Sequence, residues 1–292
     1  MQEVRYRDPA PNATEIAQRL GLHRAGRGWR GDCPACGYRG ALALDERDGR
    51  PLLWCVSCGD RDALAALLRG AGGLPPARPE RLPRLDRADP DARRRRALAI
   101  WDGAEPITPN CAATLYLARR RIGHVADSPA LRWRSDTPHP AGGRRIAMIA
   151  AIAGPDGNPQ GVQRIYLDRD GNKADCEPQK ASLGIVAGGA VRLQPASAEL
   201  VISEGLESAA SAGLLLGLPA WSAISAGNLA RNMVLPAGIR SVTIAADHDA
   251  PGLQAAEDAA VRWRDEGRAV RIIRACGPGN DANDILLGRR RP

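Results

Sequence analysis

The last third of the chain alternates between apolar, β-branched runs and amphipathic stretches, and this rhythm constrains the fold more than any other feature. We predict strands at 200–205, 220–225, 242–246 and 270–274. Helices are predicted at 208–216, 229–235 and 253–263, and a last helix begins at Asp281. This alternation predicts a parallel sheet with helices on its faces, because parallel neighbours need a crossover connection. Ligands of such sheets bind at the carboxyl ends of the strands.

Acidic residues stand at two of these strand ends. The run 242–246 stops at Asp247-His248-Asp249, and an earlier strand ends in Glu204-Gly205. Residues i and i+2 of an extended chain point to the same side, so Asp247 and Asp249 can direct two carboxylates at one point, where Glu204 can join them. Such a cluster suits a hard cation such as Mg²⁺. The alternative is a surface turn, because Asp, Pro and Gly are turn residues. We expect His248 to point away from both acids.

Four cysteines near the N-terminus have the spacing of a zinc site. Cys33, Cys36, Cys55 and Cys58 follow the pattern Cys-x2-Cys-x18-Cys-x2-Cys, which is typical of four-thiolate zinc sites. The residues 41–54 between the two pairs predict a hairpin with a polar turn, so we interpret this region as a zinc ribbon. The alternatives are two disulfides or a redox pair, and a cytoplasmic location disfavours disulfides. The other cysteines are expected to be ordinary thiols: Cys111, Cys176 and Cys276.

Between the ribbon and the β-α region lie a linker and a basic segment. Residues 71–91 hold five prolines and alternating charges, which predicts a linker. A four-arginine run, Arg93 to Arg96, opens a predicted helix that ends near Trp101. This run is either a solvated helix face or a contact for nucleic-acid phosphates. A helix is predicted at 112–121, and antiparallel strands at 145–152 and 161–167.

The charge of the chain is uneven. The net charge is +8, yet residues 197–292 hold 10 Arg against 11 Asp and Glu, so the excess of positive charge lies in residues 1–196. A basic front half and an acid-centred rear suit a nucleic-acid guide joined to a metal site, although a bias toward arginine is the alternative. Only two lysines occur, Lys173 and Lys180. With no apolar run of 18 residues and no signal-peptide core, we expect a cytoplasmic protein without membrane spans.

These motifs together resemble the Toprim domain of primases and topoisomerases. The signature of that domain is a Glu-Gly at one strand end and an Asp-x-Asp at another, here Glu204-Gly205 and Asp247-His248-Asp249. The later Asp281-Ala282-Asn283-Asp284 looks like the acidic element near the end of Toprim domains in phage and plasmid primases. The order of zinc ribbon, linker, basic α/β segment and Toprim is similar to that of DnaG-type primases. The expected parts are 1–70, 71–91, 92–196 and 197–292.

The resemblance implies a DNA primase that makes short RNA primers on single-stranded DNA, for a phage, plasmid or other mobile element. It implies catalytic Mg²⁺, with Mn²⁺ as an alternative, held by Glu204, Asp247 and Asp249, and a structural Zn²⁺ on the four cysteines. Arg164 and Lys180 look like the basic residues that grip template or nucleotide. Ribonucleoside triphosphates are the expected substrates, and a replicative helicase acting in trans is an expected partner, since the chain has no P-loop.

Some features depart from the family pattern. Cellular primases carry an Asp four residues after the Toprim Glu, whereas this chain has Glu207 three residues after Glu204. Glu207, Asp281 and Asp284 are candidates for acids that support the metal ligands, although Glu207 also fits an ordinary first helical turn. Trp54 of the ribbon could be exposed and stack on a base of the template, or it could pack beside the zinc. The alternative functions are a non-catalytic zinc and Toprim recombination mediator, a Toprim nuclease or, less compatible with the length, a type IA topoisomerase.

Overall fold

The computed structural model describes residues 11–26, 28–34, 39–47, 50–55, 61–71, 90–277 and 279–289. The chain divides into two compact units, Met1–Leu85 and Asp86–Pro292, which are described separately. Cys36, Cys58 and most of the expected linker lie outside the described residues. In the described part of the chain, no helix is both long and apolar enough to cross a membrane.

The first unit is a four-stranded antiparallel sheet with two helices. Its strands follow one another in the order β1-β2-β3-β4 and comprise His23–Ala25, Gly28–Gly31, Leu42–Arg47 and Arg50–Cys55. Helix α1 (Ala13–Arg19) begins at a capping box, in which Asn12 and Glu15 satisfy each other's backbone N–H groups. Helix α2 is Arg61–Gly70. The predicted hairpin is confirmed, because β3 pairs with β4 from Leu42–Cys55 to Arg47–Arg50.

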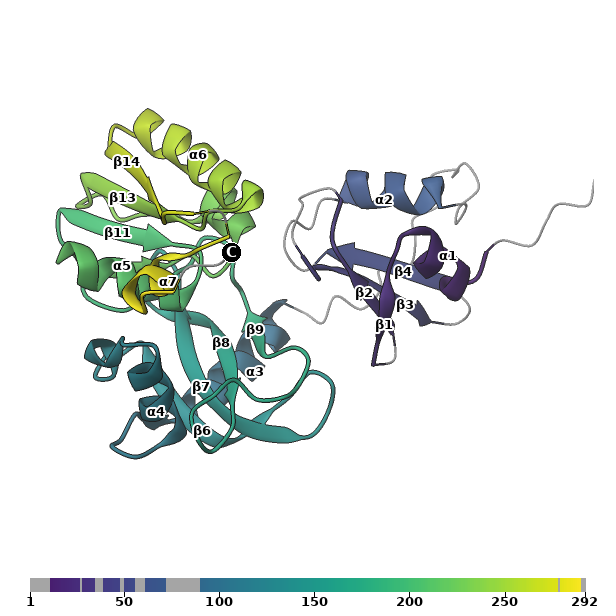
Figure 1. Ribbon diagram of the computed structural model, residues 1–292, viewed down its shortest axis with the longest axis horizontal. Coiled ribbons are helices and arrows are strands. Elements are labelled where there is room, and N and C mark those ends of the chain that lie inside the picture. The colour runs from purple at the N-terminus through teal and green to yellow at the C-terminus, as the bar shows by residue number, and fades with distance from the viewer. Residues whose placement is uncertain are drawn as a thin grey trace, which may run out of the picture. The chain divides into compact units, whose positions relative to one another are not determined.

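The second unit contains an antiparallel sheet in the order β5-β6-β7-β8-β9, of which Figure 1 labels β6 to β9. Its strands are Glu105–Pro106, Leu131–Pro138, Arg144–Ala153, Pro159–Leu167 and Lys180–Gly184. Alternate residues of β7 face opposite sides, as the period of a strand requires. Met148, Ala150 and Ile152 join one core, while Ala147 and Ile149 join another. Because both faces are covered, β7 is buried along most of its length.

Three helical segments accompany this sheet. Helix α3 (Pro90–Asp102) covers one face through Ala97, Ile100 and Trp101. Helix α4 (Ala112–Arg119) and the short 3₁₀ turn η1 (Gly123–Val125) contribute to the core of the other face. The segment Lys180–Gly184 is strand β9 at the edge of the sheet, paired with β8.

The other sheet of the second unit has the order β10-β12-β11-β13-β14. Its strands are Val191–Arg192, Ala220–Ser222, Glu199–Ser203, Ser241–Ala246 and Ala269–Arg274. Strands β11 to β14 pair in parallel, as predicted. The edge strand β10 comes from the segment before the β-α repeat, and it adds an antiparallel edge next to β12 to the predicted parallel sheet.

Helices flank this second sheet. Helix α5 (Leu206–Leu216) packs against β11 and β12, and α6 (Ala250–Asp265) packs against β13 and β14 (Figure 1). The two crossovers step in opposite directions along the sheet, so right-handed connections place α5 and α6 on opposite faces. The last helix, α7 (Ala282–Leu286), packs against α5.

One apolar core joins the two sheets of the second unit. It contains Tyr116 and Leu117 of α4, Met148 of β7, and Val201 and Leu206 of the β11–α5 region. The basic segment and the β-α region therefore form one compact unit with a continuous core, although the sequence predicts two parts that meet at residue 196.

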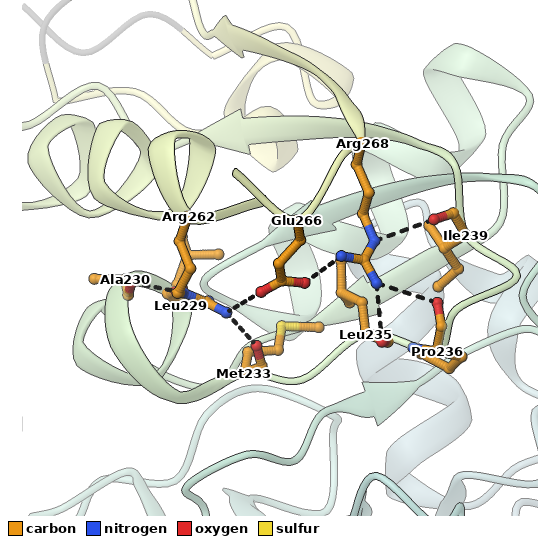
Figure 2. A network of polar contacts seen from close by, with 9 residues as sticks. All are labelled: Leu229, Ala230, Met233, Leu235, Pro236, Ile239, Arg262, Glu266 and Arg268. Atoms are coloured by element: carbon orange, nitrogen blue, oxygen red, sulfur yellow. Dashed lines mark hydrogen bonds and ion pairs between the residues drawn. The ribbon is translucent and has the colours of Figure 1, made fainter. Parts of the chain in front are cut away.

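The expected helix at 229–235 is instead a single π-helical turn, η2 (Asn228–Asn232). Met233 N–H donates to the carbonyl of Asn228, and Pro236 cannot continue a helical ladder. Carbonyls of this turn and of the residues after it accept hydrogen bonds from Arg262 of α6 and from Arg268 in the loop that follows α6, as Figure 2 shows. Arg262 donates to Leu229, Ala230 and Met233; Arg268 donates to Leu235, Pro236 and Ile239; and Glu266 lies between the two arginines.

Candidate metal and nucleotide site

The strand order creates a topological switch point between β11 and β13. Strand β11 leads through α5 to β12 on one side, and β13 leads through α6 to β14 on the other. Crevices for ligands form at such points, beyond the carboxyl ends of the strands. Glu204 is the first residue after β11, and Asp247 is the first residue after β13. The fold therefore brings together two of the three predicted acids at the place where this architecture binds ligands.

The environment of Asp247 disfavours its charge. Burial raises its pKa, and the negative charges of Glu204, Asp281 and Asp249 raise it further, to about 7. A hydrogen bond with the Ser208 side chain acts in the opposite direction. Asp247 Oδ1 is buried and has no hydrogen-bond partner within the described structure. An ionised carboxylate so placed needs a positive ligand, because mutual repulsion and burial both disfavour its charge.

Asp249 and Asp281 both begin helices. Asp249 caps α6, where its Oδ1 accepts the Gly252 N–H at 2.8 Å. Asp281 caps α7 in a capping box with Asp284, and its Oδ1 accepts the Asp284 N–H at 2.8 Å. These bonds fix one oxygen of each cap and orient the carboxyl group. The charge of Asp281 reaches Asp247, whereas Asp284 is buried and serves the cap.

Hydrogen bonds of His248 connect the end of β13 to residues 275–280. Its Nδ1 lies 2.8 Å from the Ala275 carbonyl, and its backbone N–H donates to Asn280. The Gly279 N–H donates back to the His248 carbonyl at 2.7 Å. The expectation that His248 points away from the acids fits these bonds. They also explain how residues 279–281 come to lie beside Asp247.

The acids do not form a ready-made cation cage. No group of three or more His, Cys, Asp or Glu side chains in the described ranges is arranged to hold a metal ion. Mg²⁺ does not require one, since proteins usually bind it through one or two carboxylates together with water and substrate phosphates. Hard oxygen donors, an unpartnered buried Asp247 oxygen and a pKa raised by neighbouring acids all fit a divalent cation.

Glu207 lies on the first turn of α5, three residues after Glu204. It is buried, and its Oε1 accepts the Tyr116 hydroxyl and lies 3.2 Å from Lys173 Nζ. Burial acts to raise its pKa, but the charges of Lys173 and Lys180 and the Tyr116 hydrogen bond outweigh burial and lower it to about 2. Both lysines of the chain thus interact with one carboxylate beside the acid cluster.

Arg164 and Lys180 differ in what they can contact. Arg164 is buried, and its guanidinium donates to the carbonyls of Pro138, Ala181 and Ser182. Burial lowers its pKa. A group enclosed in this way supports the β8–β9 edge, and the contact of Arg164 with template or nucleotide stays a prediction. Lys180 is exposed at the start of β9 and remains a candidate contact.

Two of the four predicted zinc ligands, Cys33 and Cys55, lie within the described residues, at one end of the sheet of the first unit. Gly31 of β2 pairs with Leu42, and Leu42 pairs with Cys55 at the end of β4. Cys33 follows β2 by two residues, so both thiols lie at the same end of the sheet, and both are buried. Trp54, next to Cys55, is 40% exposed and its ring is accessible from solvent.

Sequence reasoning missed three residues near the acid cluster. Ser208 interacts with Asp247, and its position four residues after Glu204, one helical turn away, could have indicated this contact. Tyr116 and Lys173 are brought to Glu207 from segments 91 and 34 residues away in the chain. No local pattern marks them, because only the shared core places α4 and the turn after β8 beside α5.

Comparison with known proteins supports this reading of the fold. Residues 199–290 match the Toprim domain family, and residues 91–193 match a domain of unknown function (DUF7146). No curated protein sequence is significantly similar to the chain. The zinc-binding and RNA polymerase domains of the Aquifex aeolicus primase superpose with a TM-score of 0.50 at 15% identity, covering 94% of this chain and 80% of that one.

Two further solved structures have lower scores. The primase fragment of the bacteriophage T7 primase-helicase protein has a TM-score of 0.43 at 15% identity, covering 89% of this chain and 95% of that one. A DNA primase domain from Pseudomonas aeruginosa has a TM-score of 0.45 at 14% identity, covering 67% and 74%. Residues 199–290 are thus a Toprim domain, and the chain carries a primase-like fold.

Proposed function

We propose that this protein is a DNA primase that synthesises short RNA primers on single-stranded DNA by Mg²⁺-dependent nucleotidyl transfer. The observation that carries the proposal is the acid cluster at the switch point, where neighbouring acids and burial raise the pKa of Asp247 to about 7. Such a cluster needs a divalent cation, and the triphosphate of a nucleotide completes the coordination of Mg²⁺. The primase-like fold and the Toprim domain support this choice of chemistry.

The residues of the cluster have separate tasks in this proposal. Asp247 and Asp249 bind the cation. Glu204 is either a further ligand of the cation or the group that accepts the proton of the primer's attacking 3′-hydroxyl. Ser208 and the α6 cap orient Asp247 and Asp249. Bound Mg²⁺ would neutralise the triphosphate and stabilise charge on the attacking and leaving oxygens. Lys180 contacts phosphate from the edge of the antiparallel sheet.

The first unit supplies template recognition in this proposal. Cys33, Cys36, Cys55 and Cys58 hold a structural Zn²⁺, for which their spacing and the common sheet end of the two buried thiols are the support. The exposed ring of Trp54 provides a surface on which an unpaired base can stack. A helicase acting in trans would deliver the single strand.

The test is primer synthesis by the purified full chain with random single-stranded templates, the four ribonucleoside triphosphates and Mg²⁺ or Mn²⁺. Wild type should extend primers, and Asp247→Asn should lower the rate by about 10²-fold or more, as removal of charge stabilisation in a transfer site does. Glu257→Gln, an exposed acid on α6, is the matched control and should leave the rate unchanged. Full activity of Asp247→Asn, or no product from wild type with either metal, would overturn the proposal; nicking of the template instead would indicate a nuclease.

A further inference from the structure

Asp281, at the start of α7, is tied to the end of β13 by backbone hydrogen bonds of its neighbours. The His248 N–H donates to the Asn280 carbonyl at 2.9 Å, and the Gly279 N–H donates back to the His248 carbonyl at 2.7 Å. These bonds hold the residue after Asp247 alongside the residue before Asp281. The charge of Asp281 accordingly acts on the carboxyl group of Asp247.

Asn283 connects the same short helix to α4 and α5. Its side chain is buried, with 1% exposed. Its amide nitrogen donates to the Arg120 carbonyl at 2.8 Å and to Ser211 Oγ at 2.9 Å, and its Oδ1 accepts Arg120 Nη1 at 3.3 Å. Arg120 and Asn283 are 163 positions apart in the chain. Helix α7 is therefore bonded to β13 on one side and, through one buried side chain, to α4 and α5 on the other.

The Arg120 carbonyl faces α7 because α4 ends there. Arg120 is the C-cap of α4, and Arg121 after it has a φ of +56°, a left-handed conformation that ends a helix. The last carbonyls of a helix have no partner within the helix, and the Asn283 amide satisfies the one of Arg120. Arg121 adds a further bond, because its Nη1 donates to the Leu286 carbonyl at 3.3 Å. The position of α7 thus depends on where α4 ends.

The partners of Asn283 require an amide at this position. Ser211 Oγ donates its hydrogen to the Glu207 carbonyl at 2.8 Å, so toward Asn283 it can only accept. The Arg120 carbonyl also only accepts, whereas the Arg120 guanidinium only donates. A side chain that meets two acceptors and one donor needs an NH₂ group and a carbonyl oxygen side by side. At this length only asparagine has both, so Asn283 matches its surroundings in chemistry as well as in shape.

We propose that Asn283, held by Arg120 and Ser211, is a positioning residue that keeps Asp281 beside Asp247, so that the acid cluster binds its divalent cation tightly only while α7 is bonded to α4. This inference rests on the proposed metal-dependent function and adds the support of its acid cluster. Helix α4 lies in the segment 91–193, outside the Toprim match at 199–290. One buried side chain thereby makes cation binding in the Toprim domain depend on the preceding segment. The competing account is that Asn283 only fastens α7.

The experiment measures cation affinity and stability separately. Binding of Mn²⁺ to the full chain, without nucleotide, is followed by titration calorimetry for wild type, Asn283→Ala, Asp281→Asn and the double variant, with thermal melting of each. Asn283→Ala should raise Kd about 10-fold, as loss of a residue that orients a metal-site acid does. In the Asp281→Asn background, which keeps a capping side chain, Asn283→Ala should add nothing, because it acts through Asp281. Ile285→Ala, at an exposed residue of the same helix, is the matched control and should leave Kd unchanged.

Primer synthesis gives a second readout that a merely structural role would not change. In Asn283→Ala, the Mg²⁺ concentration for half-maximal rate should rise about 10-fold. The rate at saturating Mg²⁺ should return close to that of wild type, because the acids themselves remain in place. A lower rate at saturating Mg²⁺ with an unchanged half-maximal concentration would contradict the proposal.

Other outcomes would also overturn this inference. An unchanged Mn²⁺ affinity in Asn283→Ala, with a lower melting temperature, would show that Asn283 only fastens α7. Fully additive effects of Asn283→Ala and Asp281→Asn would show that Asn283 does not act through Asp281. If Asn283→Ala does not fold, Ser211→Ala and Arg120→Met each remove one of its hydrogen-bond partners and should still weaken Mn²⁺ binding, and an unchanged Kd in both would reject the proposal. Failure of the proposed function is seen separately, as absence of primers from a wild type whose Mn²⁺ affinity still depends on Asn283.

Discussion

Glu204 and Asp247 stand at the ends of two adjacent parallel strands, and the charge of Glu204 is the largest electrostatic contribution, after burial, to the raised pKa of Asp247. The two acids are 43 positions apart in the sequence, and the pairing of β11 with β13 makes them neighbours. This relationship makes the acid cluster costly in the metal-free protein and receptive to a cation.

Without metal, the cluster should make stability depend on pH. The folded pKa of Asp247, about 7, exceeds the ordinary value of 3.8, so the folded state holds a proton that the unfolded state releases. The stability gained from this proton is complete below pH 3.8 and is lost as the pH rises through 7. In EDTA, Asp247→Asn should therefore raise the free energy of unfolding at pH 8 by about 2 kcal/mol. Urea unfolding from pH 5 to 8 measures this, and an equal pH slope in both proteins would contradict it.

Divalent cations should offset the destabilisation that the ionised acid cluster causes in the metal-free protein. Binding to the folded state alone stabilises it by about 2.7 kcal/mol when the cation is at 100 times its Kd. Millimolar Mg²⁺ or Mn²⁺ should raise the melting temperature of wild type at pH 8 and have a much smaller effect on Asp247→Asn. Glu257→Gln should respond as wild type does. Equal shifts in all three proteins would place cation binding elsewhere.

The proposed zinc site predicts a stoichiometry and a folding dependence. Metal analysis of the purified chain should give one Zn²⁺ per molecule, and Cys55→Ser should reduce it strongly. Because structural zinc contributes directly to folding, a chelator or Cys55→Ser should unfold the first unit while the second unit melts normally. Cys276→Ser, at an exposed thiol in the second unit, is the matched control and should retain the zinc. Wild type free of zinc and fully folded would contradict the site.

Arg268 should be a determinant of stability in the second unit. Its guanidinium donates to the carbonyls of Leu235, Pro236 and Ile239, and its side chain is 10% exposed. Arg268→Ala removes the guanidinium donors to the Leu235 and Ile239 carbonyls, while the Pro236 carbonyl keeps the Ile239 N–H, and should cost about 2 to 4 kcal/mol in chemical unfolding. Arg240 is an exposed arginine next to Ile239 in the sequence, and Arg240→Ala should cost less than about 0.5 kcal/mol. Similar effects of the two changes would show that the network contributes little.

Much of the fold follows from local pattern. The β-α repeat predicts β11, β13 and β14 with their helices, because burial on both faces requires continuous apolar runs. The hairpin of β3 and β4 follows equally from alternation around a polar turn. The predicted helix at 229–235 is replaced by a π-turn whose carbonyls accept hydrogen bonds from Arg262, a residue distant in sequence.

The acids at the strand ends can be recognised from the sequence alone, since Glu204 and Asp247 each end an apolar run. The raised pKa of Asp247 depends on tertiary contacts. Ser208 of α5 and Asp281 at the start of α7 act on Asp247 at the end of β13, and the packing of these separate elements brings them together. The same holds for the two lysines. Their scarcity singles them out, but only the core between the sheets brings Tyr116, Glu207 and Lys173 together, because burial of a charged group requires partners from several segments at once.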